Sequence, residues 1–212
     1  MGKTPPSATT GSRLALWFLI VFASMVALFL LPSQYFIAAT FASMACMIAV
    51  TYFLTHYSGL FRPRLVTVVM GFVSAVALYL VFYLGNAGIA TLHPLGLSSS
   101  TENSIYSLIA SPSNPLYLQV GVLAFDAVGY ESFFRGVLQT RLEPRFGARS
   151  PFLVALLDAA IHILTLNPLW VVTTFIADSC WGVTYHYSKD LTSNTLSHFV
   201  WDILIFIILP IH

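Results

Sequence analysis

The chain has 212 residues, of which 58% are hydrophobic and 8% are charged, and its mean hydropathy is +0.83. A soluble domain typically carries about 25% charged residues, so this composition excludes an ordinary soluble protein and indicates a polytopic membrane protein. The net charge of +1, without a basic cluster, gives no support for a nucleic-acid partner.

Apolar segments follow one another along the chain, and most approach the roughly 20 residues that cross a bilayer as a helix. The first follows a polar tail, residues 1–13, and lacks the small-residue exit of a cleaved signal peptide, so we expect it to remain as a helix. We therefore predict an all-α transmembrane bundle of about seven helices. They are expected over Leu14–Leu31, Tyr35–Leu54, Leu65–Leu84, Leu116–Leu138, Pro151–Leu166, Leu169–Tyr187 and Leu191–Ile211.

The basic residues indicate how these helices are oriented. With residues 1–13 as a cytoplasmic tail, eight of the nine lysine and arginine residues fall on the cytoplasmic side, and the ninth is Arg135. The connections assigned to the outside, 32–34, 85–115 and 167–168, contain no lysine or arginine. The positive-inside rule therefore predicts a cytoplasmic N-terminus and a C-terminus on the outer side.

The segments divide the chain into a peripheral and a central part. Residues 14–84 are expected to form three peripheral helices, 85–115 an outer loop, and 116–211 a core of four helices. An apolar piece of the loop, 105–110, is expected to lie on the membrane interface or to re-enter it. Ionisable residues within a membrane are costly and mark function, and they gather in the core.

Six of the ionisable side chains of the core form three pairs with a spacing of four residues. On a helix, residues i and i+4 share one face, so the members of each pair can interact. Counted at 1.5 Å per residue, the pairs lie at similar depths in the bilayer. A single polar cavity, open toward the cytoplasmic half, explains all three pairs together. They are Glu131 with Arg135, Asp158 with His162, and His198 with Asp202.

Two histidines and a carboxylate in such a pocket have two main uses. A carboxylate can take a proton from water while histidines position the water or stabilise an oxyanion. Histidine, aspartate and glutamate can also bind zinc, but the chain has no H-E-x-x-H sequence, so zinc ranks lower and no cofactor is predicted. Each residue taken singly is also explained by a structural hydrogen bond or ion pair.

The three pairs resemble the motifs of the CPBP family, which includes type II CAAX prenyl endopeptidases and bacteriocin-processing and self-immunity (Abi) proteins. The family motifs read E-E-x-x-x-R, F-x-x-x-H and H-x-x-x-N/D. This chain has Y-E-S-F-F-R from Tyr130, D-A-A-I-H from Asp158 and H-F-V-W-D from His198. The resemblance covers the chain from about Leu116 to its C-terminus, and it implies an intramembrane endopeptidase that hydrolyses a peptide bond with an activated water.

The resemblance also carries functional roles over to individual positions. It implies that a glutamate and His162 activate the water, and that His198 and Asp202 hold the oxyanion. Glu131 and Arg135 match the second glutamate and the arginine of the first motif.

Two positions depart from the family pattern. Tyr130 stands where the family has its first glutamate, the presumed general base, and Asp158 stands where the family has phenylalanine. Tyrosine, with an ordinary pKa of about 10, is a poor base near neutral pH. We hypothesise that Asp158 or Glu131 serves as the base, with Asp178 as a further candidate. Asp126, one turn before Tyr130, is expected to hydrogen-bond the tyrosine hydroxyl in a structural role.

Three classes of function remain open. The first is an endopeptidase that cleaves a small protein or peptide, as a multi-pass protein of a prokaryotic cell membrane. The second is a catalytically inactive binding or immunity protein that keeps the cavity. A proton or ion transporter ranks last, because the polar residues gather at one depth instead of crossing the bilayer. The predicted partners are a peptide or protein substrate and membrane lipids, and no nucleic acid.

Overall fold

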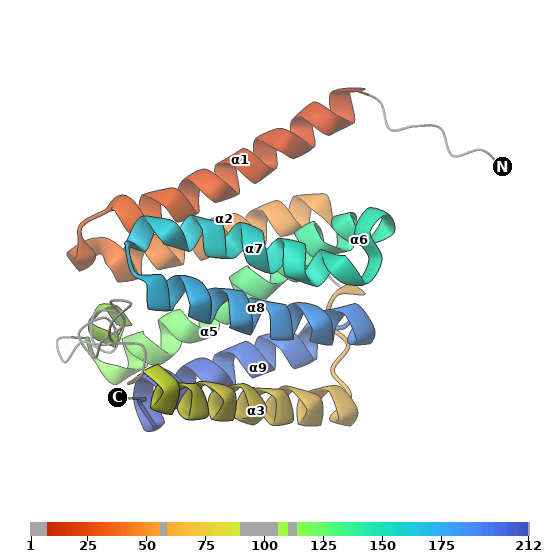
Figure 1. The fold of residues 1–212 in the computed structure, drawn as a ribbon. Helices are drawn as coiled ribbons and strands as arrows, with labels where there is room; N and C mark the ends of the chain where they lie inside the picture. Colours follow the sequence, from red (N-terminus) through yellow and green to blue (C-terminus); the bar gives the residue numbers. More distant parts are fainter. Residues whose placement is uncertain (1–7, 56–58, 90–105, 110–113, 212) are drawn as a thin grey trace.

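The computed structural model describes residues 8–55, 59–89, 106–109 and 114–211 (Figure 1). Within these ranges the regular structure is helical, without strands, which confirms the predicted all-α class. Helices occur at every predicted place. The principal ones are α1 (Ala8–Leu30), α2 (Phe36–Leu54), α3 (Leu65–Ile89), α5 (Leu116–Phe133), α6 (Thr140–Phe146), α7 (Ser150–His162), α8 (Pro168–Ser188) and α9 (Leu191–Ile203).

Local sequence signals start the last two helices. The side chain of Asn167 accepts a hydrogen bond from the Trp170 backbone N–H at 3.1 Å, and Pro168 occupies the first turn of α8. The side chain of Asp190 accepts from the Thr192 N–H at 2.9 Å at the start of α9. These caps satisfy backbone donors that have no partner within the helix, so each helix begins at a defined residue.

Two helices continue into π-helical turns. Residues Phe134–Gln139 extend α5, and residues Leu204–Ile208 extend α9. Single π turns inside α-helices occur frequently at functional sites. The first of these turns contains Arg135 and the second begins two residues after Asp202, so both distortions flank the predicted site.

The apolar helices support an integral membrane location. By length and composition, four stretches can cross a bilayer, and the third of them runs through α5, α6 and α7. The apolar stretch of α1, Ala15–Leu30, is shorter, and α8 is not among the candidates. The four stretches are Ser33–Leu54, Leu65–Asn86, Leu116–Thr165 and Leu191–Ile208.

Figure 1 shows the helices packed side by side, with α1 and α3 at opposite edges and α5, α8 and α9 between them. The closest helix pairs are α7 with α8, α3 with α9, and α2 with α5. One hydrophobic cluster joins α1, α2 and α5 around Met44 and Phe133. A second joins α3, α8 and α9 around Trp181 and Trp201. The buried charged and histidine side chains lie on α5 and its π-helical continuation, and on α7, α8 and α9 or at the start of α9.

Gly129 lies where α5 meets α2, and it generates a prediction about stability. A Cβ atom at this position would lie 2.8 Å from Met44 Cβ and 3.0 Å from the Met44 carbonyl oxygen. We expect Gly129→Ala to separate the two helices and to lower the free energy of unfolding by about 1–3 kcal/mol. The melting temperature of the purified protein in detergent measures this effect. Gly121→Ala, on the same helix with nothing within 4 Å of the added atom, is the matched control. Equal melting temperatures for the two variants would contradict the close contact.

Candidate active site

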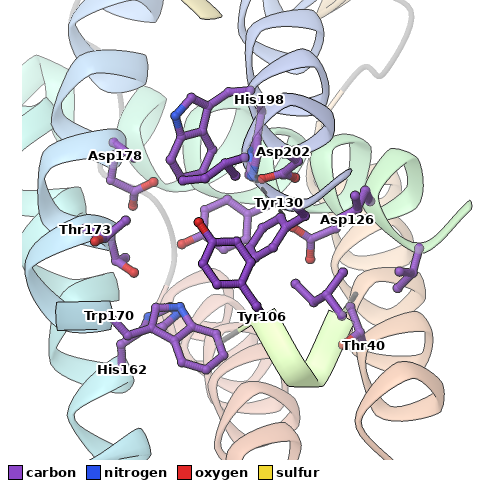
Figure 2. A pocket seen from close by; sticks show the side chains of 18 of the residues that line it. Thr40, Tyr106, Asp126, Tyr130, His162, Trp170, Thr173, Asp178, His198 and Asp202 are labelled. Carbon is purple, nitrogen blue, oxygen red and sulfur yellow. Dashed lines mark ion pairs between the residues drawn. The ribbon is translucent and has the colours of Figure 1, made fainter. Parts of the chain in front are cut away.

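A cavity of about 200 Å³ lies among α5, α7, α8 and α9, with the ends of α1, α2 and α3 around it. Most of its wall is apolar or aromatic. Figure 2 shows Asp126, Asp202 and His198 close together, with His162 and Trp170 at the other end of the view. Both motif histidines therefore face one cavity, as the sequence predicts. The ionisable side chains that line it are Asp126, Tyr130, His162, Asp178, His198 and Asp202.

The lysine and arginine residues between helices define one end of the bundle, called here the basic end. The cavity lies at the opposite end. Its lining includes Phe29 and Asn86 near the ends of α1 and α3, and Phe36 and Leu169 at the starts of α2 and α8. The lysine and arginine residues between helices lie at the opposite ends of these helices. The prediction of a cavity that opens toward the cytoplasmic half is therefore wrong: when the basic end is cytoplasmic, the cavity lies in the outer half.

Bulky side chains fill the bundle between the cavity and the basic connections. Phe133, Phe134 and Val137 are fully buried in that half of the bundle. Arg141 Nη2 also donates to the Leu54 carbonyl oxygen at 3.1 Å, which ties α6 to the end of α2. The spacing of residues along a helix predicts the depth of each polar group. It does not predict which part of the bundle is filled by aromatic side chains, and this decides where the cavity opens.

Part of the predicted outer loop contributes to the cavity. Tyr106 and Ile109, from the short helical piece 106–109, are among the lining residues. The Ile211 backbone N–H donates to the Tyr106 hydroxyl at 3.0 Å, which joins this piece to the end of the chain. Residues 90–105 and 110–113 of the predicted loop lie outside the described residues.

Arg135 is fully buried and pairs with two carboxylates. Its Nε lies 3.3 Å from Glu131 Oε2, and its Nη2 lies 2.6 Å from Asp178 Oδ1. The Glu131–Arg135 pair is thus formed as predicted, whereas Asp178 is a partner that the spacing within one helix could not indicate. Neither Arg135 nor Glu131 is among the lining residues of the cavity. Together they form a charged centre behind its wall.

His198 is held by contacts on both of its nitrogens. Nδ1 lies 3.0 Å from Glu131 Oε1. Ionised Glu131 can only accept a hydrogen bond, so Nδ1 carries the hydrogen. Nε2 lies 3.6 Å from Asp202 Oδ2 and 3.7 Å from Asp126 Oδ2. The Trp181 ring stacks on the imidazole with the two centroids 4.0 Å apart, which fixes the plane of the ring.

His162, like His198, is held through its Nδ1 atom. Nδ1 lies 3.0 Å from the Asp158 carbonyl oxygen and 3.6 Å from Asp158 Oδ2. A carbonyl oxygen can only accept, so Nδ1 carries the hydrogen and Nε2 of the neutral ring is an acceptor. The rings of Phe29 and Trp170 flank the imidazole, with centroids 4.8 Å and 5.7 Å away. The imidazole is therefore held through Nδ1, with the Asp158 carboxylate nearby, and the ring lines the cavity.

The two departures from the family pattern contact each other. The Tyr130 hydroxyl donates a hydrogen bond to Asp158 Oδ2. The prediction that Asp126 bonds this hydroxyl is therefore wrong, because the tyrosine ring extends from α5 across to α7 while Asp126 lies beside His198. Asp158 is fully buried and does not line the cavity, whereas Tyr130 does. Tyr130 thus separates the Asp158 carboxylate from the cavity.

Sequence reasoning missed one polar residue that supports the site. Asn194 Nδ2 donates to the Trp181 carbonyl oxygen at 2.6 Å and lies 3.4 Å from Glu131 Oε2. The sequence contains a pattern that could have identified Asn194. It precedes His198 by four residues, as His198 precedes Asp202, so the three residues share one face of α9. The stacking of Trp181 had no comparable signal, because it depends on how α8 and α9 pack.

The pairing of Arg135 leads to a second prediction. Arg135→Met would leave Glu131 and Asp178 buried without a cation, and breaking a buried ion pair in this way typically costs about 3–5 kcal/mol. We expect a correspondingly large drop in the melting temperature in detergent, or loss of folded protein. Arg149→Met, at an exposed position, is the matched control and should change stability by less than about 0.5 kcal/mol. Similar effects of the two substitutions would contradict the structural role of Arg135.

Comparison with known proteins identifies a family with the same motifs. Residues 112–204 match the family model of type II CAAX prenyl endopeptidase Rce1-like proteins. Comparisons with the curated proteins and with the solved structures give no significant match. The matched range contains all three motifs and the helices from α5 to α9 in full, which confirms the resemblance found in the sequence. Residues 112–204 of this integral membrane protein are therefore similar to the type II CAAX prenyl endopeptidase Rce1-like proteins.

Proposed function

We propose that this protein is an intramembrane endopeptidase that hydrolyses a peptide bond with a water activated by His162. One observation carries the proposal: His162 and His198, from two helices, face one cavity, and each has Nδ1 held by an acceptor. The family match is to membrane proteases, which favours hydrolysis over other uses of such a cavity. The proposed catalytic set is Glu131, Arg135, Asp158, His162, His198 and Asp202.

His162 supplies the base in this proposal. Its Nε2 takes a proton from the water that attacks the peptide carbonyl carbon, and the resulting imidazolium later gives the proton to the leaving amine. The Asp158 carboxylate, 3.6 Å from Nδ1, stabilises the imidazolium by its charge, while Nδ1–H is donated to the Asp158 backbone carbonyl oxygen. Asp158 thus acts behind His162, since Tyr130 keeps it from direct contact with the water.

His198 stabilises the negative charge that develops on the carbonyl oxygen. A protonated Nε2 donates to the oxyanion, and the carboxylates of Asp202 and Asp126 favour that charged form. Glu131, fixed by Arg135 and Asn194, holds the opposite side of the ring. Such a preoriented donor is typically worth about 2.7–4 kcal/mol of transition-state stabilisation.

The cavity wall suggests the substrate class. Trp170, Trp201, Phe82 and Phe206 are among the aromatic residues that line it, so it suits an extended peptide segment with apolar side chains. In the predicted orientation this segment reaches the site from the outer half of the bilayer. We propose a small membrane-associated protein or peptide as substrate and a prokaryotic cell membrane as the location.

A second candidate is a binding or immunity protein without turnover. The observation that favours it is Tyr130, which replaces the expected general base and whose hydroxyl is already engaged by Asp158. In that case the cavity holds a peptide without cleaving it. A transporter gains no support, because the ionisable residues that line the cavity lie in one half of the bundle.

Peptide hydrolysis by the purified protein tests the proposal. Incubation in detergent with a mixed library of apolar peptides, followed by mass spectrometry, should reveal cleavage products. We expect His162→Ala to lower the rate by about 10²–10⁴-fold, the usual contribution of a general base. His186→Ala is the matched control, because His186 pairs with Glu143 at 2.8 Å and does not line the cavity. Peptide binding by the wild type without any cleavage would instead favour the second candidate.

The role of Asp158 has its own test. We expect Asp158→Asn to lower kcat at least tenfold with little change in KM, because a neutral amide cannot stabilise the imidazolium. The melting temperature of the variant shows whether it is folded. Unchanged turnover in a folded Asp158→Asn protein would exclude Asp158 from the mechanism.

A further inference from the structure

We propose that a groove between α3, α5 and α9 binds an anionic phospholipid, with an acyl chain in the groove and the headgroup on Arg62 and Arg64. The groove has a volume of about 470 Å³ and shares no lining residue with the cavity that holds the two histidines. Figure 1 shows α3 and α9 side by side at one edge of the bundle. The three helices contribute Val68 and Phe72, Ala124 and Val128, and Leu196 and Phe199 to the groove.

The shape of the groove suits one acyl chain. Its walls are apolar and partly exposed, and Phe72 is 49% exposed, so in a bilayer this face meets lipid. Along α9 the groove runs from Thr192 to Phe199, which is about 10 Å at 1.5 Å per residue. The hydrocarbon core of a bilayer is about 30 Å thick, so the groove lies within one leaflet. This length fits a chain from that leaflet better than a helix of a second copy, which crosses both leaflets.

The connection before α3 is tied down at the basic end of the groove. The Arg62 backbone N–H donates to Asp190 Oδ1 at 3.1 Å, which fastens the connection to the start of α9. The Arg64 backbone N–H donates to Thr67 Oγ1 at 3.0 Å, within the same connection and the first turn of α3. Phe61, the residue before Arg62, itself lines the groove. Both arginines are therefore held beside the basic end of the groove.

The charge at this point selects an anionic headgroup. Arg62 and Arg64 are exposed, and among the described residues neither side chain forms an ion pair. The acidic side chains of the basic end are already engaged, because Glu143 pairs with Lys189 and Asp190 accepts from backbone N–H groups. A guanidinium binds a phosphate through two parallel hydrogen bonds. Basic pockets between transmembrane helices on the cytoplasmic side are typical sites for anionic lipid headgroups.

Two threonine hydroxyls in the groove wall lack a hydrogen-bond partner among the described residues. They belong to Thr192, in the first turn of α9, and to Thr195, one turn further along the helix. Buried hydroxyls without a partner are uncommon in native structures. The ester carbonyl oxygens of a phospholipid lie between its headgroup and its chains, at the level of the first turn of α9. An ester oxygen there supplies the acceptor that Thr192 lacks.

The lipid site is separate from the proposed catalytic set. The groove residues Thr192, Leu196 and Phe199 lie on a different face of α9 from His198 and Asp202, which line the cavity. A bound lipid therefore supports α9 against α3 and α5 without contacting the reacting groups. Lipid binding does not depend on peptide hydrolysis, so the two proposals succeed or fail independently.

Lipid binding by the purified full chain tests the headgroup site. The protein in detergent is titrated with dioleoylphosphatidylglycerol or dioleoylphosphatidylcholine, and bound lipids are counted by native mass spectrometry. We expect one tightly held phosphatidylglycerol per chain and at least a tenfold weaker affinity for phosphatidylcholine. Replacing both arginines, Arg62→Gln with Arg64→Gln, should abolish this preference. Arg149→Gln is the matched control, because Arg149 is exposed at the start of α7, outside the groove, and should keep the preference.

A second pair of variants tests the chain site. Ala124→Phe fills the groove and should weaken phosphatidylglycerol binding at least tenfold, whereas Ala160→Phe, at an exposed position on α7, should not. The lipid should raise the melting temperature of the wild type and of Ala160→Phe, but not that of Ala124→Phe, because a ligand stabilises only the state that binds it. Glycerol 3-phosphate, which has the phosphate without the chains, should leave the melting temperature unchanged.

Three results would overturn the proposal. The first is equal affinity of the wild type for the two lipids, and the second is full phosphatidylglycerol binding by folded Ala124→Phe. The third is a dimer of the wild type that Ala124→Phe dissociates, which would show that a second copy of the chain occupies the groove. The double arginine variant decides the headgroup site even where Ala124→Phe fails to fold.

Discussion

The buried guanidinium of Arg135 is the interaction on which the polar centre depends. It lies between the carboxylates of Glu131, one turn away on the chain, and Asp178, on α8. Without that positive charge, two carboxylates would face each other in an apolar bundle, where uncompensated charge is very unfavourable. With it, Glu131 stays ionised and can orient His198, and α5, α8 and α9 are joined through polar contacts. The ion pair is therefore the foundation of the site, while the groups able to react lie in front of it.

Much of the architecture was predictable because it follows from local patterns. Every apolar segment corresponds to a helix, since length and hydropathy are local properties of the chain. The i,i+4 pairs were equally accessible, because a helix fixes which residues share a face. Asp126 and Asp178 show the limit of this reasoning. Their partners, His198 and Arg135, lie on other helices, and the packing of helices decides such contacts. The direction in which the cavity opens was mispredicted for the same reason, since it depends on side-chain volume between helices.

The contact between Tyr130 and Asp158 places the two unusual motif positions in one hydrogen bond. A glutamate at the first position would bring a second negative charge next to Asp158 in a fully buried setting. A tyrosine hydroxyl instead donates to that carboxylate, so the pair is compatible within one protein. This gives a physical reason for the two residues to occur together. Of Asp158 and His162, which lie one turn apart on α7, only His162 lines the cavity.

The position of the cavity at the end remote from the basic connections has a consequence for the living cell. With the basic residues in the cytoplasm, the side chains of the cavity equilibrate with the outer compartment and not with the cytosol. The peptides that reach the site and the inhibitors that could block it are then those of the outside medium. A reagent that cannot cross the membrane would find its target, while the cytosolic pool of peptides would remain out of reach.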